Sequence, residues 1–168
     1  MRSLKLARAA AVTVASTALI LGGVSAASAA PAHTATSSSG VTPHAAGATL
    51  TSASISFFTL DDNKDFDTLL TIQVRTAGGT VVASKTAFFG EFRDQSSTTI
   101  PLPIRSGISW DALQGGNLRL TIQPNGHDTW KFGYELDLNF SDGDFVPTTE
   151  SRLSLSESNK VFTDPLQF

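Results

Sequence analysis

The chain has 168 residues, with 12 basic and 15 acidic side chains and no cysteine. The lack of cysteine excludes disulfide bonds, a thiol nucleophile and thiolate metal sites. The excess of acidic residues argues against nucleic acid as a partner. All 11 phenylalanines, both tryptophans and the single tyrosine lie beyond residue 50. The side chains that can form a core are therefore confined to that part of the chain.

The first 29 residues have the pattern of a secretory signal peptide. Arg2, Lys5 and Arg8 precede an uncharged apolar run over 9–24, and small residues follow up to Ala29. The run is shorter than the roughly 20 residues of a membrane-spanning helix. We therefore expect no transmembrane segment, cleavage near Ala29 in the general (Sec) pathway, and a secreted, extracellular protein. Loss of the three basic leader residues changes the net charge from −3 to −6.

Residues 30–49 are rich in Ala, Ser and Thr and contain no aromatic residue and no Asp, Glu, Lys or Arg. Such a segment buries too little apolar surface to offset the entropy lost on ordering. The sequence therefore predicts a disordered spacer over 30–49 and one folded domain over 50–168. His33 and His44 lie in the spacer, where isolated histidines are far more often inert than zinc ligands.

Alternating apolar and polar residues dominate the folded domain. The clearest run is 130–140, in which six apolar residues from Trp130 to Phe140 share one face. Such period-two alternation is typical of a half-buried strand. Shorter or weaker patterns indicate further strands at 51–59, 69–75, 81–83, 100–104, 117–123, 146–155 and 160–163. Eight short strands separated by turns predict an all-β fold, an antiparallel eight-stranded β-sandwich.

A strongly acidic segment, LDDNKDFDT, occupies residues 60–68 between two of these strands. Its four aspartates are Asp61, Asp62, Asp65 and Asp67. Carboxylates this close together repel one another unless they are solvated or neutralised by a cation. Calcium suits such a loop because it takes about six to eight oxygen ligands in flexible geometry. The alternative is an ordinary solvated turn, since Asp and Asn are common turn residues.

The order of the strands brings further oxygen ligands to this loop. If consecutive strands run antiparallel, every second loop lies at the same end of the sandwich. The loops grouped with the acidic segment are then 88–97, 124–129 and 156–159. The second of these contains NGHDTW, so Asn125 and Asp128 are expected to approach the acidic segment.

Two stretches, DDNKDFDTLLTIQV (61–74) and PNGHDTWKFGYELDLNFSDG (124–143), place one acidic loop after the first strand and another before an aromatic strand. This arrangement resembles the C2 and PLAT/LH2 class of calcium-dependent β-sandwiches, and the Ala-rich leader resembles those of actinobacteria. The resemblance implies calcium ligands at Asp61, Asp62, Asp65, Asp67 and Asp128. It also implies a lipid, membrane or protein ligand near that end. Membrane-binding members of the class carry basic or apolar loop tips beside the calcium, and only Lys64 and Phe66 could serve here, so lipid binding is the part of the resemblance with the least support.

Little in the sequence indicates catalysis. His127 is the only histidine beyond residue 50 and precedes Asp128, but sequence neighbours on a loop point in different directions and do not make a triad. No G-x-S-x-G motif is present, and the glycine pairs at 78–79 and 115–116 are simple turns. We therefore expect a protein that is not an enzyme.

The two tryptophans bear on a second possible function, sugar binding, because an exposed indole stacks on a sugar ring. Trp130 is in phase with the buried face and is expected in the core. Trp110 lies in a connecting turn and is the better candidate, although a tryptophan that plugs the end of a sandwich is the commoner case. The leading hypothesis is a secreted module that binds calcium through the Asp-rich loop, for stability or to bind a ligand or partner. The alternative is a secreted carbohydrate-binding or inhibitor-like β-sandwich module without metal, which would make a glycan or a protein the ligand.

Overall fold

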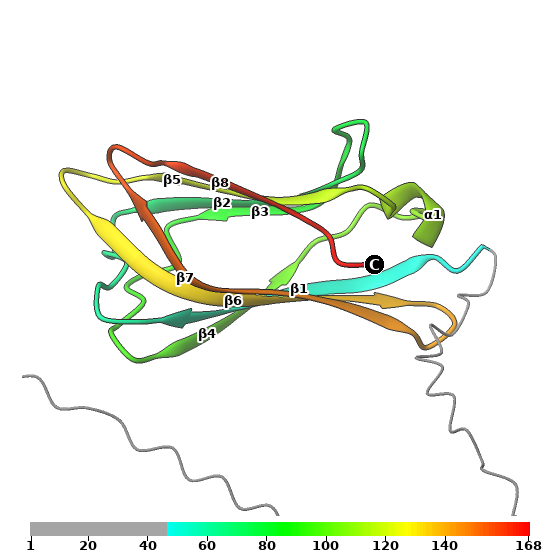
Figure 1. Cartoon of the computed structure of the whole chain (residues 1–168), viewed down its shortest axis with the longest axis horizontal. Coiled ribbons are helices and arrows are strands. Elements are labelled where there is room, and N and C mark those ends of the chain that lie inside the picture. The colour runs from blue at the N-terminus through cyan, green and yellow to red at the C-terminus, as the bar shows by residue number, and fades with distance from the viewer. Residues whose placement is uncertain (1–46) are drawn as a thin grey trace, which may run out of the picture. The chain divides into compact units, whose positions relative to one another are not determined.

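The computed structural model describes residues 47–168, which form an all-β domain with one short helix (Figure 1). In chain order the elements are β1 (Leu50–Thr59), β2 (Leu69–Arg75), β3 (Val81–Ala87), β4 (Ser97–Leu102), α1 (Trp110–Leu113), β5 (Asn117–Gln123), β6 (Thr129–Phe140), β7 (Phe145–Ser156) and β8 (Val161–Pro165). The predicted leader and spacer residues 30–46, with His33 and His44, lie outside the described residues. In the described part, no helix is long and apolar enough to cross a membrane.

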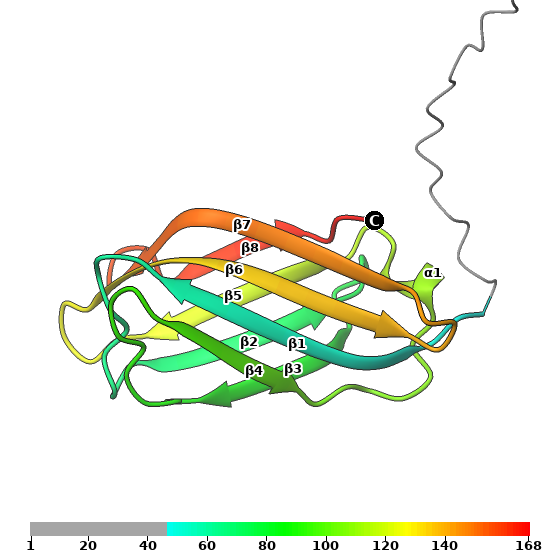
Figure 2. The same ribbon diagram turned by 90° about the horizontal axis from the view of Figure 1, so that it is seen from below.

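Two antiparallel four-stranded sheets face each other, with strand orders β4-β1-β6-β7 and β3-β2-β5-β8 (Figures 1 and 2). This arrangement confirms the predicted antiparallel eight-stranded sandwich. The chain passes from one sheet to the other after β1, β3, β4, β5 and β7. The connection after β4 runs through α1. The loops after β1, β3, β5 and β7 are those that strand counting places at one end; we call them the four crossing loops, and this end the loop end.

The core lies between the sheets and is aromatic next to the loop end. Trp130 is fully buried, as its place in the alternation predicts, and its ring stacks on Phe132 with centroids 3.9 Å apart. Phe57 and Phe92 meet the Trp130 ring edge-on at 5.0 and 5.5 Å. The indole N–H donates to the hydroxyl of Thr59 at 3.2 Å, so its one polar atom is satisfied inside the core.

The opposite end of the sandwich is closed by the short helix and the C-terminal residues. Ser109 caps α1 by accepting a hydrogen bond from the backbone N–H of Ala112. Trp110 packs edge-on against Phe140 at 5.1 Å and Phe168 at 4.5 Å. Trp110 therefore plugs this end and is not a free platform for a sugar ring.

Several boundaries differ from those expected. β3 continues to Ala87 because it pairs with β2 along its whole length, and β4 is shifted toward the N-terminus because it pairs with β1. The folded domain also begins before Leu50: Ala48 is buried, and Thr49 pairs with Ser109. These contacts join the last two residues of the expected spacer to the sandwich.

Candidate functional site at the acidic loop end

Direct contacts join the four crossing loops. The backbones of Lys64 and Phe92 exchange hydrogen bonds of 3.2 and 2.9 Å, which tie the first loop to the second. The first and third loops meet where the Thr68 hydroxyl donates to the Asp128 carboxylate at 2.5 Å. The third and fourth meet where His127 Nδ1 lies 2.5 Å from the Glu157 carboxylate. The expectation that these loops share one end is confirmed.

Lys64 is the centre of this end, and its side chain is fully buried. Its ammonium donates to four backbone carbonyls, those of Asp65 at 2.8 Å, Thr68 at 3.0 Å, Phe88 at 2.7 Å and Gly90 at 2.8 Å. It also lies 5.0 Å from the centre of the Phe92 ring, within reach of a cation–π interaction. Lys64 therefore does not serve as the basic loop tip that the sequence allows, because its side chain points inward.

The backbone of the second loop is shaped to receive this ammonium. Phe89 and Gly90 both have a positive φ, of 59° and 76°. Few non-glycine residues adopt this left-handed conformation. The resulting bend allows the carbonyls on either side of Phe89 to reach one ammonium. No sequence pattern signals such a cage, because a lysine among aspartates in a loop is usually solvated.

Charge at the centre of the loop end is balanced internally. Burial lowers the pKa of Lys64, while the nearby carboxylates of Asp128, Asp65 and Asp67 act in the opposite direction. A buried ammonium is tolerated only when it is hydrogen-bonded and compensated. The four carbonyls and the three carboxylates meet both needs. The lysine thereby places a positive charge among the acids of the loop.

The five aspartates predicted to bind calcium divide into two groups. Asp61 and Asp62 face the ammonium of Lys131, at 3.7 and 2.6 Å. Asp65, Asp67 and Asp128 lie around Lys64, where Asp67 accepts a hydrogen bond from Asn125 at 2.9 Å and Asp128 accepts from Thr68. Within residues 47–168, no three His, Asp or Glu side chains gather in a group that could hold a metal ion.

Asp65 keeps the clearest signature of repulsion between like charges. Partial desolvation raises the pKa of Asp65, and the neighbouring charges of Asp128, Asp67 and Glu91 raise it further. Lys64 opposes this effect but does not cancel it. Some of the repulsion that the sequence predicts for the acidic loop therefore persists at this residue.

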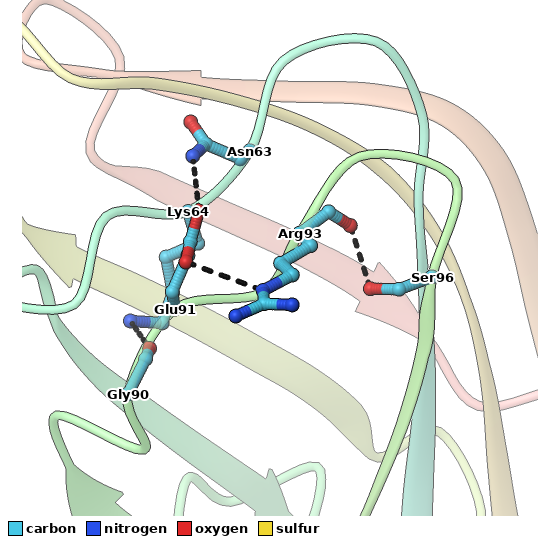
Figure 3. A network of polar contacts seen from close by, with 6 residues as sticks. All are labelled: Asn63, Lys64, Gly90, Glu91, Arg93 and Ser96. Carbon is cyan, nitrogen blue, oxygen red and sulfur yellow. Dashed lines mark hydrogen bonds and ion pairs between the residues drawn. The ribbon is translucent and has the colours of Figure 1, made fainter.

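A network of side chains fixes the second loop on the first (Figure 3). Asn63 donates to the Glu91 carboxylate at 3.1 Å, and the guanidinium of Arg93 lies 3.5 Å from the same carboxylate. Ser96 donates to the backbone carbonyl of Arg93 at 2.6 Å. Glu91 thus joins the two loops on the solvent side, while Lys64 joins them on the inner side.

Two aromatic side chains extend from these fixed loops into solvent. Phe66 is 70% exposed and Phe88 is 54% exposed. The Lys64 ammonium holds the carbonyl of Phe88 and the carbonyl of Asp65, the residue before Phe66. The four crossing loops contain eight acidic residues and three basic ones. The loop end is therefore a rigid, acidic surface that carries two exposed phenylalanines.

His127 and Trp110 offer no reacting or sugar-binding constellation. The imidazole of His127 is 94% exposed and lies against Glu157. Among residues 47–168, it makes no hydrogen bond to a serine or threonine hydroxyl that would suggest a nucleophile. Trp110 is enclosed by Phe140 and Phe168.

Comparison with known proteins adds no relative from which a function could be transferred. No protein-family model matches the chain, and no curated protein matches it. The chemistry of the loop end is therefore the basis for inferring function.

Proposed function

We propose that the protein is a secreted, non-enzymatic β-sandwich module that binds a partner at its loop end. The observation that carries this proposal is the exposure of Phe66 and Phe88 on loops held by the buried Lys64 ammonium. Exposed aromatic residues surrounded by polar ones are typical of interaction sites. Because the loops are already fixed, a partner would bind with little loss of loop entropy.

The charge of this surface favours a basic, partly apolar protein segment as the partner. Eight acidic residues stand against three basic ones in the crossing loops, and one of the three, Lys64, is buried. An acidic surface attracts cationic partners and repels anionic membranes and nucleic acid. The membrane binding implied by the C2 resemblance therefore has less support than protein binding, because its basic loop tip points inward.

Secretion is supported by the signal-peptide pattern of the first 29 residues. A role without catalysis is supported by His127, which is exposed and paired with Glu157 on the surface. The sandwich then serves as a rigid support, and the loops provide the chemistry of recognition.

The proposal is tested by calorimetric titration of the protein with a soluble peptide of alternating lysine and leucine residues. An otherwise identical peptide with glutamate in place of lysine is the charge control. We expect the basic peptide alone to bind, with an affinity that falls as salt is added. Anionic phosphatidylserine vesicles should not bind, and vesicle binding in place of peptide binding would contradict the proposal.

Matched variants locate the surface. Replacing Phe66 and Phe88 together with serine should weaken peptide binding by about tenfold or more, since aromatic residues dominate most interfaces. Phe145→Ser is the control, because Phe145 is 60% exposed but begins β7 at the opposite end of the sandwich. Equal effects of the two changes would show that the peptide does not recognise the loop end.

Calcium binding at the same end is a second candidate function. The raised pKa of Asp65, caused in part by the charges of Asp128 and Asp67, is the observation that favours it. A divalent cation would relieve this repulsion. Of the five aspartates that the C2 resemblance implies, these three carry the candidate, because Asp61 and Asp62 are engaged by Lys131. Their carboxylates would have to draw together around the ion, since within residues 47–168 no three such side chains already gather in a group that could hold it.

Calorimetric titration of calcium into the wild-type protein and Asp65→Asn tests this candidate. Extracellular modules bind calcium at about 10⁻⁴–10⁻³ M, so the titration must reach millimolar concentrations. We expect wild-type uptake to be weakened by the substitution. Absence of uptake by the wild type would show that Lys64 and Lys131 are the only cations the loop needs.

A further inference from the structure

A hollow of about 470 Å³ opens on the outer face of the β4-β1-β6-β7 sheet. One wall is the ring of Phe58, which is 43% exposed on β1. The other wall is the segment Glu150–Arg152 of β7, and Glu135 of β6 borders the same space. Its volume is that of a small-molecule site.

Gly133 forms the floor of this hollow and cannot be replaced by a larger residue without a shift. It pairs directly with Phe58 across β1 and β6. A Cβ atom at this position would lie 2.9 Å from the carbonyl oxygen of Glu150 and 3.4 Å from Cα of Ser151. The glycine therefore allows the backbone of β7 to approach β6 closely at the edge of the hollow.

The β7 wall is a β-bulge with a strained residue. The register between β6 and β7 shifts between Phe132 and Tyr134, opposite the segment that contains Arg152. Arg152 has φ of 59°, a left-handed conformation that glycine adopts far more readily than arginine. Bulges commonly redirect a side chain toward a site, and backbone strain concentrates at functional positions.

Charged side chains at the hollow have no partner elsewhere in the described part of the chain. Within residues 47–168, neither Glu135, Glu150 nor Arg152 has a side-chain hydrogen bond or ion pair. Carboxylates supply hydrogen-bond acceptors and a guanidinium supplies donors. The hollow thus combines an apolar aromatic wall with unpaired donors and acceptors on the facing wall.

We infer that this hollow binds a neutral pyranose ring, as part of a glycan. The ring's C–H face would pack on Phe58, and its hydroxyl groups would bind Glu135, Arg152 and the hydroxyl of Ser151. Two carboxylates against one guanidinium disfavour an acidic sugar. This site is separate from the aromatic tips of the loop end and does not depend on the proposed protein partner.

The inference is tested by following backbone amide resonances while glucose, galactose, N-acetylglucosamine and their β-linked disaccharides are added in turn. We expect at least one of these sugars to cause saturable shifts that centre on Phe58, Gly133 and Ser151. The expected affinity is in the millimolar range for a single ring in an open hollow. No saturable shift with any of these probes at tens of millimolar would overturn the inference.

Arg152→Gly and Phe58→Ala are the informative variants. Arg152→Gly relieves the left-handed backbone, so the protein should be as stable as the wild type or more stable while sugar binding falls by about tenfold or more. Phe58→Ala should have a similar effect on binding. Phe145→Ala, which removes a phenylalanine that is exposed but does not line the hollow, should leave sugar binding unchanged. Unchanged affinity in both Arg152→Gly and Phe58→Ala would show that the sugar binds elsewhere and would overturn the inference.

Discussion

The ammonium of Lys64 is bound by four backbone carbonyls from two loops, and the ring of Phe92 lies beside it. All three N–H groups of the ammonium are therefore used, and at least one of them is shared between two carbonyls. The same charge offsets the aspartates around it. One residue therefore connects the two loops and reduces the repulsion within the acidic segment.

Lys64→Met should strongly destabilise the protein. Methionine fills a similar volume but removes the donor that four carbonyls share, of which only that of Asp65 is also shown to accept from a backbone N–H, that of Thr68. It also removes the positive charge near Asp65 and Asp128. We expect a loss of at least about 3 kcal/mol in the free energy of unfolding, measured by urea denaturation. Lys160→Met, at an exposed position, is the control and should have almost no effect. A loss no larger than that of the control would mean that the cage contributes little to stability.

Asp65→Asn should stabilise the calcium-free protein at neutral pH. The folded-state pKa of Asp65 is raised above 3.8, so the folded protein binds its proton more tightly than the unfolded chain does. Stability of the wild type therefore falls as pH rises from 3.8 through the raised pKa, and the asparagine variant lacks this loss. Urea unfolding below pH 3.8 and at neutral pH checks this, and the advantage of the variant should appear only at neutral pH. A variant that is less stable at neutral pH would contradict the assignment of repulsion to Asp65.

At the scale of elements, β6 and β7 show what the alternation of apolar and polar residues predicts correctly and what it misses. Alternation correctly predicts that Trp130 to Phe140 has one buried face, because the side chains of a strand point alternately to its two sides. The bulge opposite Gly133 is not visible in the sequence. Glycine also occurs in strands for several other reasons, and only the close approach of the β7 backbone reveals its role here.

Gly133→Ala should destabilise the pairing of β6 with β7. The added methyl group meets backbone atoms of Glu150 and Ser151, which cannot rotate away as a side chain could. We expect a loss of about 1–3 kcal/mol, the usual cost of overpacking, measured by thermal unfolding. Gly78→Ala is the matched control, because its Cβ would meet only the Thr76 hydroxyl at 3.8 Å. Equal effects at the two glycines would argue against a tight crossing at the bulge.

At the scale of the whole molecule, the sandwich is closed by residues from both ends of the described chain. Ala48 is buried beside the core, and its carbonyl accepts a hydrogen bond from the Trp110 backbone at 2.9 Å. Leu166 near the C-terminus is also buried, and its backbone donates to the carbonyl of Gly116 at 3.0 Å. These contacts hold the end of the sandwich that lies away from the four crossing loops.

Two truncations test where the folded domain begins. A chain that starts at Gly47 should unfold at the same temperature as the mature protein, because residues 30–46 contain no large apolar side chain that could be buried. A chain that starts at Leu50 should unfold at a lower temperature, since it loses buried Ala48 and the hydrogen bonds of Thr49. Equal midpoints for the two chains would show that these two residues add nothing to stability.

The sequence by itself determined the sandwich and the grouping of its loops. Period-two alternation depends only on neighbouring residues, so the burial of Trp130 and the number of strands follow from local pattern. Antiparallel counting then placed the acidic loop beside Asp128. The sequence also predicts a secretory leader, which lies outside the described residues.

Only the tertiary structure decided how the charges of the loop end are matched. The carbonyl of Phe88, 24 residues from Lys64, accepts from its ammonium, and Asp62 faces Lys131 on a distant strand. Nothing in the local pattern distinguishes a lysine that turns inward from one that remains in solvent, because both occur in polar loops. The difference arises when folding brings backbone carbonyls from two loops to one point, where they can replace the water around a buried ammonium.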